Sequence, residues 1–204
     1  MKWRYKTGAA VRSAGSHFGY SYPDVVGDTI YMGDQYDYVY AIDKDTGKLK
    51  WKFHEKKVYF TCTSVVDGVV YVGRWTNRII TDKKSYIYAI DAANGKLKWR
   101  SEIGSPSGMI GSPTAVDGTV YIGSSDNHLY AVDTSSGKIK WSFKTVNFIV
   151  ATPLVSDGVV YIISKNNLYA IDAKNGELKW QYKTGSEYFA SYSIVGDMVY
   201  VGSL

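Results

Sequence analysis

The residues that could carry out chemistry are few in this 204-residue chain, and they are scattered along it. His17, His54 and His128 are the only histidines, and they lack the short spacing typical of metal ligands. Cys62 is the only cysteine, so it cannot form a disulfide within the chain. No Asp-x-Asp-x-Asp cluster offers hard oxygen ligands for calcium. We therefore predict no catalytic residue and no metal site.

Four aspartates could be considered as general bases, but each occupies the same place in a repeated string. The string is Ala-(Ile/Val)-Asp-x-x-x-Gly-(Lys/Glu)-(Leu/Ile)-Lys-Trp, and such self-similarity predicts a repeat architecture. Because the aspartates recur identically, we interpret them as turn residues. The four copies cover residues 41–51, 89–99, 131–141 and 170–180, with the aspartates at Asp43, Asp91, Asp133 and Asp172.

Each copy of the string predicts a β-hairpin. The residues before the aspartate, for example 38–42, alternate as a strand does, and Gly47 supplies a positive φ at little steric cost. In the second strand, alternation places Leu49, Trp51 and Phe53 on one face and the lysines on the other. We expect the recurring tryptophans to form the hydrophobic core between repeats.

A second recurring hairpin lies upstream of each string, with Asp-Gly or Gly-Asp between two apolar runs. One repeat is therefore four strands in a meander, which we name A, B, C and D in chain order. The many glycines and tyrosines and the absence of a helical apolar period also favour an all-β chain. The upstream hairpins cover residues 24–33, 64–73, 114–123, 154–163 and 193–202.

The repeated string resembles the tryptophan-docking motif of quinoprotein-like β-propellers. That family includes pyrroloquinoline-quinone alcohol dehydrogenases and also non-enzymatic members, such as the propeller lipoprotein of the outer-membrane assembly machinery. The resemblance covers essentially the whole chain and implies a β-propeller of four-stranded antiparallel blades. Because enzymes and scaffolds share the motif, it specifies the fold and not the activity.

The resemblance predicts one propeller domain over residues 1–204, with four complete blades and a partial fifth. The fifth would combine strands A and B from the C-terminus with strand D from the N-terminus, and strand C would be missing. Three arrangements remain open: a self-closed five-blade ring, a fragment of a larger propeller, and a ring completed between chains. The complete blades are expected at about 20–54, 60–103, 110–144 and 150–183, and the partial blade at 2–7 with 189–204.

The repeats differ most in two connections, which are expected on one face of the disc. Residues 8–17 lengthen the first D–A connection, and residues 74–84 lengthen one B–C loop. Loops on a rigid scaffold often carry binding, and Trp and Arg are enriched in binding hot spots. The alternative is that the B–C loop only packs over its neighbour. We predict a ligand- or partner-binding surface formed by His17, Tyr20, Tyr36, Tyr38, Arg74, Trp75 and Arg78.

The resemblance also bears on catalysis. The enzymatic relatives hold their quinone against a ring made by two adjacent disulfide-bonded cysteines, beside a calcium ion and an Asp base. Cys62 alone cannot make that ring. We therefore expect no cofactor, no enzymatic activity, and a scaffold for protein–protein interaction or ligand sensing. The alternatives are a truncated propeller of a quinone-dependent dehydrogenase and a carbohydrate- or surface-binding module that uses the tyrosines.

The net charge of +5 has a structural explanation, since many lysines fall in the last strand of each repeat. Lysines on an exposed sheet edge prevent strand addition, and no nucleic-acid-binding motif is present. No apolar run is long enough to span a membrane. Residues 1–6 form no apolar signal, so the chain is cytoplasmic or a piece of a longer exported protein. The resemblance favours export to the periplasm or cell surface, with another protein as partner and homo-oligomers through the unpaired terminal strands.

Overall fold

The computed structural model describes residues 2–7, 23–34, 37–56, 58–75, 84–104, 111–149, 151–183, 189–196 and 198–203. Within these ranges every regular element is a β-strand, and no helix there is long and apolar enough to cross a membrane. Blade 1 contains β1 (Asp24–Val26), β2 (Thr29–Gly33), β3 (Tyr38–Asp43) and β4 (Leu49–His54). Blade 2 contains β5 (Tyr59–Val66), β6 (Val69–Trp75), β7 (Tyr86–Asp91) and β8 (Leu97–Glu102).

The remaining strands repeat this order. Blade 3 contains β9 (Thr114–Val116), β10 (Thr119–Gly123), β11 (His128–Asp133) and β12 (Ile139–Lys144). Blade 4 contains β13 (Leu154–Ser156), β14 (Val159–Ser164), β15 (Asn167–Asp172) and β16 (Leu178–Lys183). β17 (Phe189–Val195) and β18 (Met198–Ser203) form a separate two-stranded sheet.

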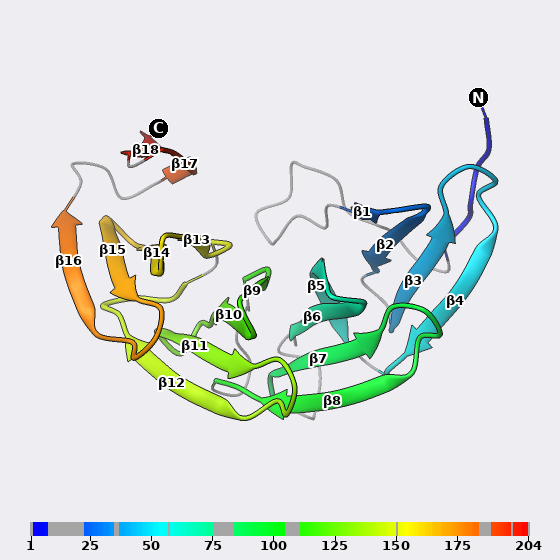
Figure 1. Ribbon diagram of the computed structural model, residues 1–204, viewed down its shortest axis with the longest axis horizontal. Coiled ribbons are helices and arrows are strands. Elements are labelled where there is room, and N and C mark those ends of the chain that lie inside the picture. The colour runs from blue at the N-terminus through cyan, green and yellow to red at the C-terminus, as the bar shows by residue number, and fades with distance from the viewer. Residues whose placement is uncertain are drawn as a thin grey trace.

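The four complete sheets follow one another along an open arc, with β4, β8, β12 and β16 on its outer side (Figure 1). Each sheet is an antiparallel meander in which consecutive strands pair. This arrangement confirms the predicted all-β propeller of four-stranded blades, with strand D at the outer edge of each blade.

The hairpin turns within each blade lie close together at one end of the strands. The amide of Lys44, in the C–D turn of blade 1, donates to the carbonyl of Asp28 in the A–B turn at 2.9 Å. In blade 2, Asp67 and Gly68 both have positive φ, at 49° and 71°, which is the conformation that a two-residue hairpin turn requires. The Asp-Gly hairpins predicted from the sequence are therefore confirmed.

The expectation that Leu49 shares the buried face of Trp51 was wrong. Leu49 is 40% exposed, whereas Trp51 is 9% exposed. The pairing of β3 with β4 shifts its register here, because Ile42 lies opposite Leu49 while Ala41 lies opposite Trp51. The bulge leaves Lys50 as an extra residue and ends the strict alternation of faces. The same register shift occurs in the other three complete blades.

A hydrophobic core separates each pair of successive blades. Between blades 1 and 2, Tyr31 and Val39 of the first pack against Val70 and Val72 of the second. Equivalent cores lie between blades 2 and 3 and between blades 3 and 4. Because each blade buries its apolar faces only against its neighbours, the fold is stabilised blade by blade, as in other repeat proteins.

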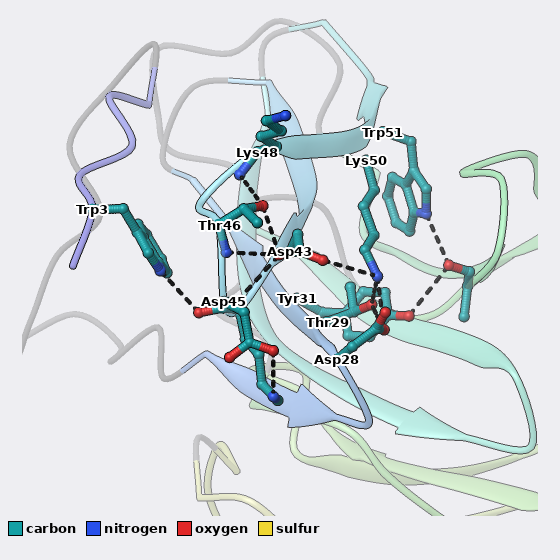
Figure 2. Close-up of polar contacts among 12 residues, drawn as sticks. Trp3, Asp28, Thr29, Tyr31, Asp43, Asp45, Thr46, Lys48, Lys50 and Trp51 are labelled. Atoms are coloured by element: carbon teal, nitrogen blue, oxygen red, sulfur yellow. Dashed lines mark hydrogen bonds and ion pairs between the residues drawn. The ribbon is translucent and has the colours of Figure 1, made fainter.

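The recurring tryptophans link one blade to the next. The indole Nε1 of Trp51 donates to the carbonyl of Ala92, in the C–D turn of blade 2, at 2.8 Å (Figure 2). Trp99 and Trp141 bond in the same way to the turns of blades 3 and 4, at 2.8 and 3.1 Å. For these three tryptophans the interpretation as core residues between repeats is confirmed, whereas Trp180 is 43% exposed.

The two ends of the arc differ from the composite fifth blade that the sequence suggested. Residues 2–7 lie against blade 1, where Trp3 donates to the carbonyl of Lys44 at 2.8 Å, whereas β17 and β18 lie at the other end (Figure 1). The fifth sheet therefore contains two strands, without strand D from the N-terminus. Trp3 thus occupies on blade 1 the place that Trp51 occupies on blade 2, which is where the tryptophan of the predicted strand D would dock.

Candidate functional site

Where the structure describes them, the B–C loops and D–A connections meet on the face opposite to the hairpin turns, which we call the loop face. In blade 1 the amide of Glu55 donates to the carbonyl of Asp37 at 2.9 Å, and the amide of Phe60 donates to the carbonyl of Asp34 at 3.2 Å. The amide of Val58 also donates to the Asp37 carboxylate at 3.0 Å. These bonds hold the two connections together, so the loop face of blade 1 is fixed by the strands that enter and leave it.

An aromatic and cationic cluster occupies the outer part of this face. Tyr38 begins β3 and His54 ends β4, and the antiparallel register places them opposite each other. Their rings stack with centroids 4.6 Å apart, and Nζ of Lys52 lies 4.8 Å from the centre of the Tyr38 ring. The His54 Nε2 lies 4.0 Å from a carboxylate oxygen of Asp37. We call Tyr38, Lys52 and His54 the Tyr38 cluster.

Beneath the cluster, Asp34 organises the B–C loop. Its side chain accepts hydrogen bonds from the Tyr40 hydroxyl and from the Tyr38 amide, both at 2.9 Å. Asp34 is only 1% exposed, and a buried carboxylate is tolerated where such bonds compensate for lost hydration. The loop conformation that presents Tyr38 therefore depends on Asp34.

Arg74 has a different environment from the one expected of a binding residue. It is 3% exposed, and its guanidinium lies 5.4 Å from the centre of the Tyr86 ring. Arg100 approaches the same ring at 5.2 Å. Burial raises the pKa of the neighbouring Tyr88 to about 12. The Arg74 side chain thus packs beneath the loop face, against Tyr86.

The structure places three of the seven predicted site residues. Tyr38 is half-buried on the loop face, Arg74 is buried, and Trp75 ends β6 with its backbone opposite Tyr59. Lys52 and His54 were not predicted, although the hairpin register of residues 38–54 would have paired Tyr38 with His54. The remaining four predicted residues, His17, Tyr20, Tyr36 and Arg78, lie outside the described residues.

The residues found at the position of the Tyr38–His54 pair differ from blade to blade. The equivalent cross-strand pairs are Tyr86 with Glu102 and His128 with Lys144. In blade 4, Asn167 lies opposite Lys183. The hairpin turns at the other end of the strands stay nearly constant, so the side chains that differ between blades gather at the loop face.

The recurring aspartates are structural, as predicted. The Asp133 carboxylate accepts hydrogen bonds from the Ser135 hydroxyl at 2.6 Å and from the Ser136 hydroxyl at 2.8 Å, together with both backbone amides. These bonds hold its pKa well below the usual range. Asp43 accepts equivalent bonds from Thr46, which also lower its pKa (Figure 2). A general base is effective when its pKa lies near the working pH, so these carboxylates are unsuited to that role.

The residues present do not fit a quinone and its calcium ion. Cys62 is buried in β5, and the sequence has no second cysteine with which it could form a disulfide ring. Among the described residues, no group of three or more His, Cys, Asp or Glu side chains is placed to hold a metal ion. We therefore derive no reaction step through such a group.

Comparison with known families defines the class of this protein. A profile described as "Outer membrane protein assembly factor BamB" matches residues 83–203, and one described as "Glucose/ethanol/alcohol dehydrogenase, beta-propeller domain" matches residues 1–104. Each covers more than half of the chain, and both describe pyrroloquinoline-quinone-type repeats. The chain belongs to the family of propellers built from these repeats. Comparison with curated protein sequences gave no match.

Solved structures share the fold. BamB from Moraxella catarrhalis is 19% identical with a TM-score of 0.60, over 87% of this chain and 68% of that one. The quinohemoprotein alcohol dehydrogenase ADHIIG from Pseudomonas putida HK5 is 18% identical with a TM-score of 0.67, over 88% of this chain. The enzyme from Comamonas testosteroni is 17% identical with a TM-score of 0.68, over 89% of this chain. This chain spans only 37% and 38% of the two dehydrogenases.

Proposed function

We propose that this protein is a non-catalytic propeller scaffold that binds another protein through its loop face. The observation that carries the proposal is the Tyr38 cluster, in which an aromatic ring, an imidazole and an ammonium group are stacked on one blade. Tyrosine offers a large, rigid contact area at low entropic cost and is enriched at the centres of interfaces. Lys52 and His54 add donors that could pair with carboxylates of a partner.

The rigid support of the cluster favours binding over a purely structural role. Asp34 and Asp37 fix both loops beneath Tyr38 through hydrogen bonds, so little ordering would be needed when a partner binds. The predicted residues His17, Tyr20, Tyr36, Trp75 and Arg78 would extend this surface across the neighbouring loops. Arg74 would support it from below, through its contact with Tyr86.

We place the protein outside the cytoplasm, in the periplasm or at the cell surface, in keeping with the family member described as an outer membrane protein assembly factor. The partner would accordingly be an envelope protein. The proposed scaffold function also agrees with the fold, which supplies several loops on a rigid frame.

A direct test uses immobilised protein and a detergent extract of bacterial envelope proteins. The wild type, Tyr38→Ala and the control Tyr182→Ala are compared by quantitative mass spectrometry. Tyr182 is an exposed tyrosine of β16 at the outer edge of blade 4, away from the loop face of blade 1. We expect a defined protein to be retained by the wild type and by Tyr182→Ala and lost with Tyr38→Ala. Equal retention by all three proteins would contradict the proposal.

The second candidate is the propeller portion of a quinone-dependent dehydrogenase, which the match of residues 1–104 favours. The two candidate functions are distinguished by adding pyrroloquinoline quinone and calcium ions to the purified chain. Quinone absorbance that stays with the protein on gel filtration, together with alcohol-dependent reduction of a dye, would support the enzyme. The scaffold proposal expects neither signal.

A further inference from the structure

The connection between blades 3 and 4, residues 145–149, is anchored at both of its ends on blade 3. The amide of Thr145 donates to the carbonyl of Asn127 at 2.7 Å, and the amide of Ile149 donates to the carbonyl of Ser124 at 3.0 Å. Ser124 and Asn127 belong to the B–C loop between β10 and β11. Blade 3 therefore sets where the connection begins and ends.

The middle of the connection is tied to blade 4. The hydroxyl of Ser164, at the end of β14, donates to the carbonyl of Asn147 at 2.6 Å, and the Asn147 amide donates to that hydroxyl oxygen at 3.2 Å. The Thr145 hydroxyl donates to the same carbonyl at 2.6 Å, and the Phe148 amide donates to the Asn147 side chain at 2.8 Å. Blades 3 and 4 are both complete four-stranded sheets within the arc, so this anchoring involves neither end of the chain (Figure 1).

Two apolar side chains on this anchored connection face the solvent. Val146 is 64% exposed and Phe148 is 47% exposed, whereas Thr145 and Ile149 beside them are 5% and 0% exposed. Because hydrogen bonds fix the backbone on both sides, neither exposed side chain can turn inward without breaking them. Exposed apolar side chains that gather in one place mark binding sites more often than single ones do.

The equivalent connection between blades 1 and 2 makes the same two backbone bonds to its B–C loop but presents other side chains. It buries Val58 and Phe60, which are 2% and 6% exposed, and places Lys56 in the solvent. The same frame thus exposes a lysine in one connection and a valine with a phenylalanine in the other. The exposed apolar pair is therefore specific to the connection between blades 3 and 4 and is not required by the fold.

Positive charges flank the apolar pair. Lys144 ends β12 two residues before Val146, and Lys165 directly follows Ser164, which holds the connection; both lysines are exposed. Lys144 occupies the position of Glu102 in blade 2, opposite the first residue of strand C, so the sign of the charge is reversed there.

The carboxylate of the adjoining B–C loop is engaged in bonds of its own. Asp126 accepts hydrogen bonds from the Tyr130 hydroxyl at 2.6 Å and from the His128 amide at 3.1 Å. Its side chain is only 14% exposed, so it does little to offset the two lysines. This part of the loop face therefore offers apolar and positively charged groups together.

We propose that Val146 and Phe148, together with Lys144 and Lys165, form a docking site for an acidic segment of a partner protein. An apolar side chain of that segment covers the apolar pair, and carboxylates on either side of it pair with the two ammonium groups. Opposite charges around an apolar centre guide a partner into register. Because the connection is already ordered, little conformational entropy is lost on binding. A protein segment is favoured over a nucleic acid, because two lysines supply few phosphate contacts.

The first test selects ligands for the purified chain from a phage-displayed library of random peptides. Counter-selection uses the double variant Val146→Ser with Phe148→Ser, which removes the apolar pair and keeps the backbone bonds. Peptides that carry aspartate or glutamate around an aromatic or aliphatic residue should be enriched on the wild type alone. Enrichment of basic or uncharged peptides, or of no peptide, would overturn the proposal.

The affinity of the most enriched peptide is then measured by fluorescence anisotropy on a labelled synthetic copy. The double variant Val146→Ser with Phe148→Ser should bind it at least about tenfold more weakly. Lys144→Ala with Lys165→Ala should also weaken binding and should flatten its dependence on salt concentration. The matched control is Leu97→Ser, at an exposed apolar position of β8, which should bind like the wild type.

This site goes beyond the proposed function, whose surface is the Tyr38 cluster on blade 1. Tyr38→Ala should leave the affinity for the peptide unchanged, so the two proposals can fail independently. Positions 144, 146, 148 and 165 are exposed, so thermal unfolding of their variants should match that of the wild type. Equal affinity of the wild type and the Val146→Ser, Phe148→Ser double variant would overturn the inference. Equally tight binding of a single-stranded oligonucleotide would overturn it as well, because it would assign the surface to nucleic acid.

Discussion

The indole of Trp51 lies directly against Gly95, so that a Cβ built on Gly95 would lie 2.8 Å from the ring carbon Cδ2. Gly95 also has a φ of 74°, which closes the C–D turn of blade 2. The same residue therefore serves two purposes: it shapes the turn and leaves room for the tryptophan of the preceding blade. Gly137 and Gly176 stand in the same relation to Trp99 and Trp141.

These two purposes can be separated by comparing Gly95→Ala with Gly68→Ala. Both positions have positive φ, at 74° and 71°, so backbone strain in the alanine variant should lower the free energy of unfolding by about 1–2 kcal/mol at either position. A Cβ on Gly68 meets nothing within 4 Å. At Gly95 it overlaps the indole, which adds about 1–3 kcal/mol. Urea titration should show the larger loss for Gly95→Ala, and equal losses would contradict the packing role.

Removal of a docking tryptophan should be among the most destabilising single changes. Trp99→Ala leaves a cavity between blades 2 and 3 and removes the hydrogen bond to Thr134, so we expect a loss of about 3–5 kcal/mol. Trp180→Ala is the matched comparison, because that indole is 43% exposed and should cost much less. Urea titration measures both, and a loss below about 1 kcal/mol for Trp99→Ala would argue against docking as the source of stability.

The bond between Asp34 and Tyr40 should contribute measurably to the stability of the loop face. Asp34→Ala removes the acceptor of a buried hydroxyl, which costs about 1–3 kcal/mol. Tyr40→Phe leaves the ring in place but takes a hydrogen bond from the buried Asp34 carboxylate, so it should also cost about 1–3 kcal/mol. If the bond is formed, the double variant loses less than the sum of the two single losses. Strict additivity in this double-mutant cycle would show that the two groups do not interact.

Acid should weaken the C–D turns. In the folded protein, hydrogen bonds from Ser135 and Ser136 lower the pKa of Asp133, so near pH 4 the unfolded chain binds more protons than the folded one. The stability that this carboxylate contributes is present above its unfolded pKa and is lost as the pH falls through the lower folded pKa. We expect Asp133→Asn to reduce the dependence of the urea midpoint on pH between about 5 and 2. An unchanged slope would contradict this assignment.

The sequence predicted the fold because its determinants are local and repeated. The Asp-x-x-x-Gly turns, the Asp-Gly hairpins and the spacing of Trp51, Trp99 and Trp141 specify strand order and blade boundaries within short windows. The prediction that side chains alternate between faces was wrong at Leu49, because a bulge at Lys50 interrupts the pleat of the strand. Such a register shift depends on the pairing of two strands and is not visible in the residue pattern.

The tertiary structure decided what depends on residues far apart in the chain. Tyr31 and Trp51 share the carbonyl of Ala92 only because blade 2 brings its turn to them. Arg74, which the sequence suggested as part of a binding surface, is buried, and its guanidinium packs against the ring of Tyr86 on the paired strand. Trp3 lies on the C–D turn of blade 1, at the end of the arc opposite to β17 and β18 (Figure 1). The repeated string specifies each blade by itself, but only the packing of successive blades decides which side chains remain available to a partner.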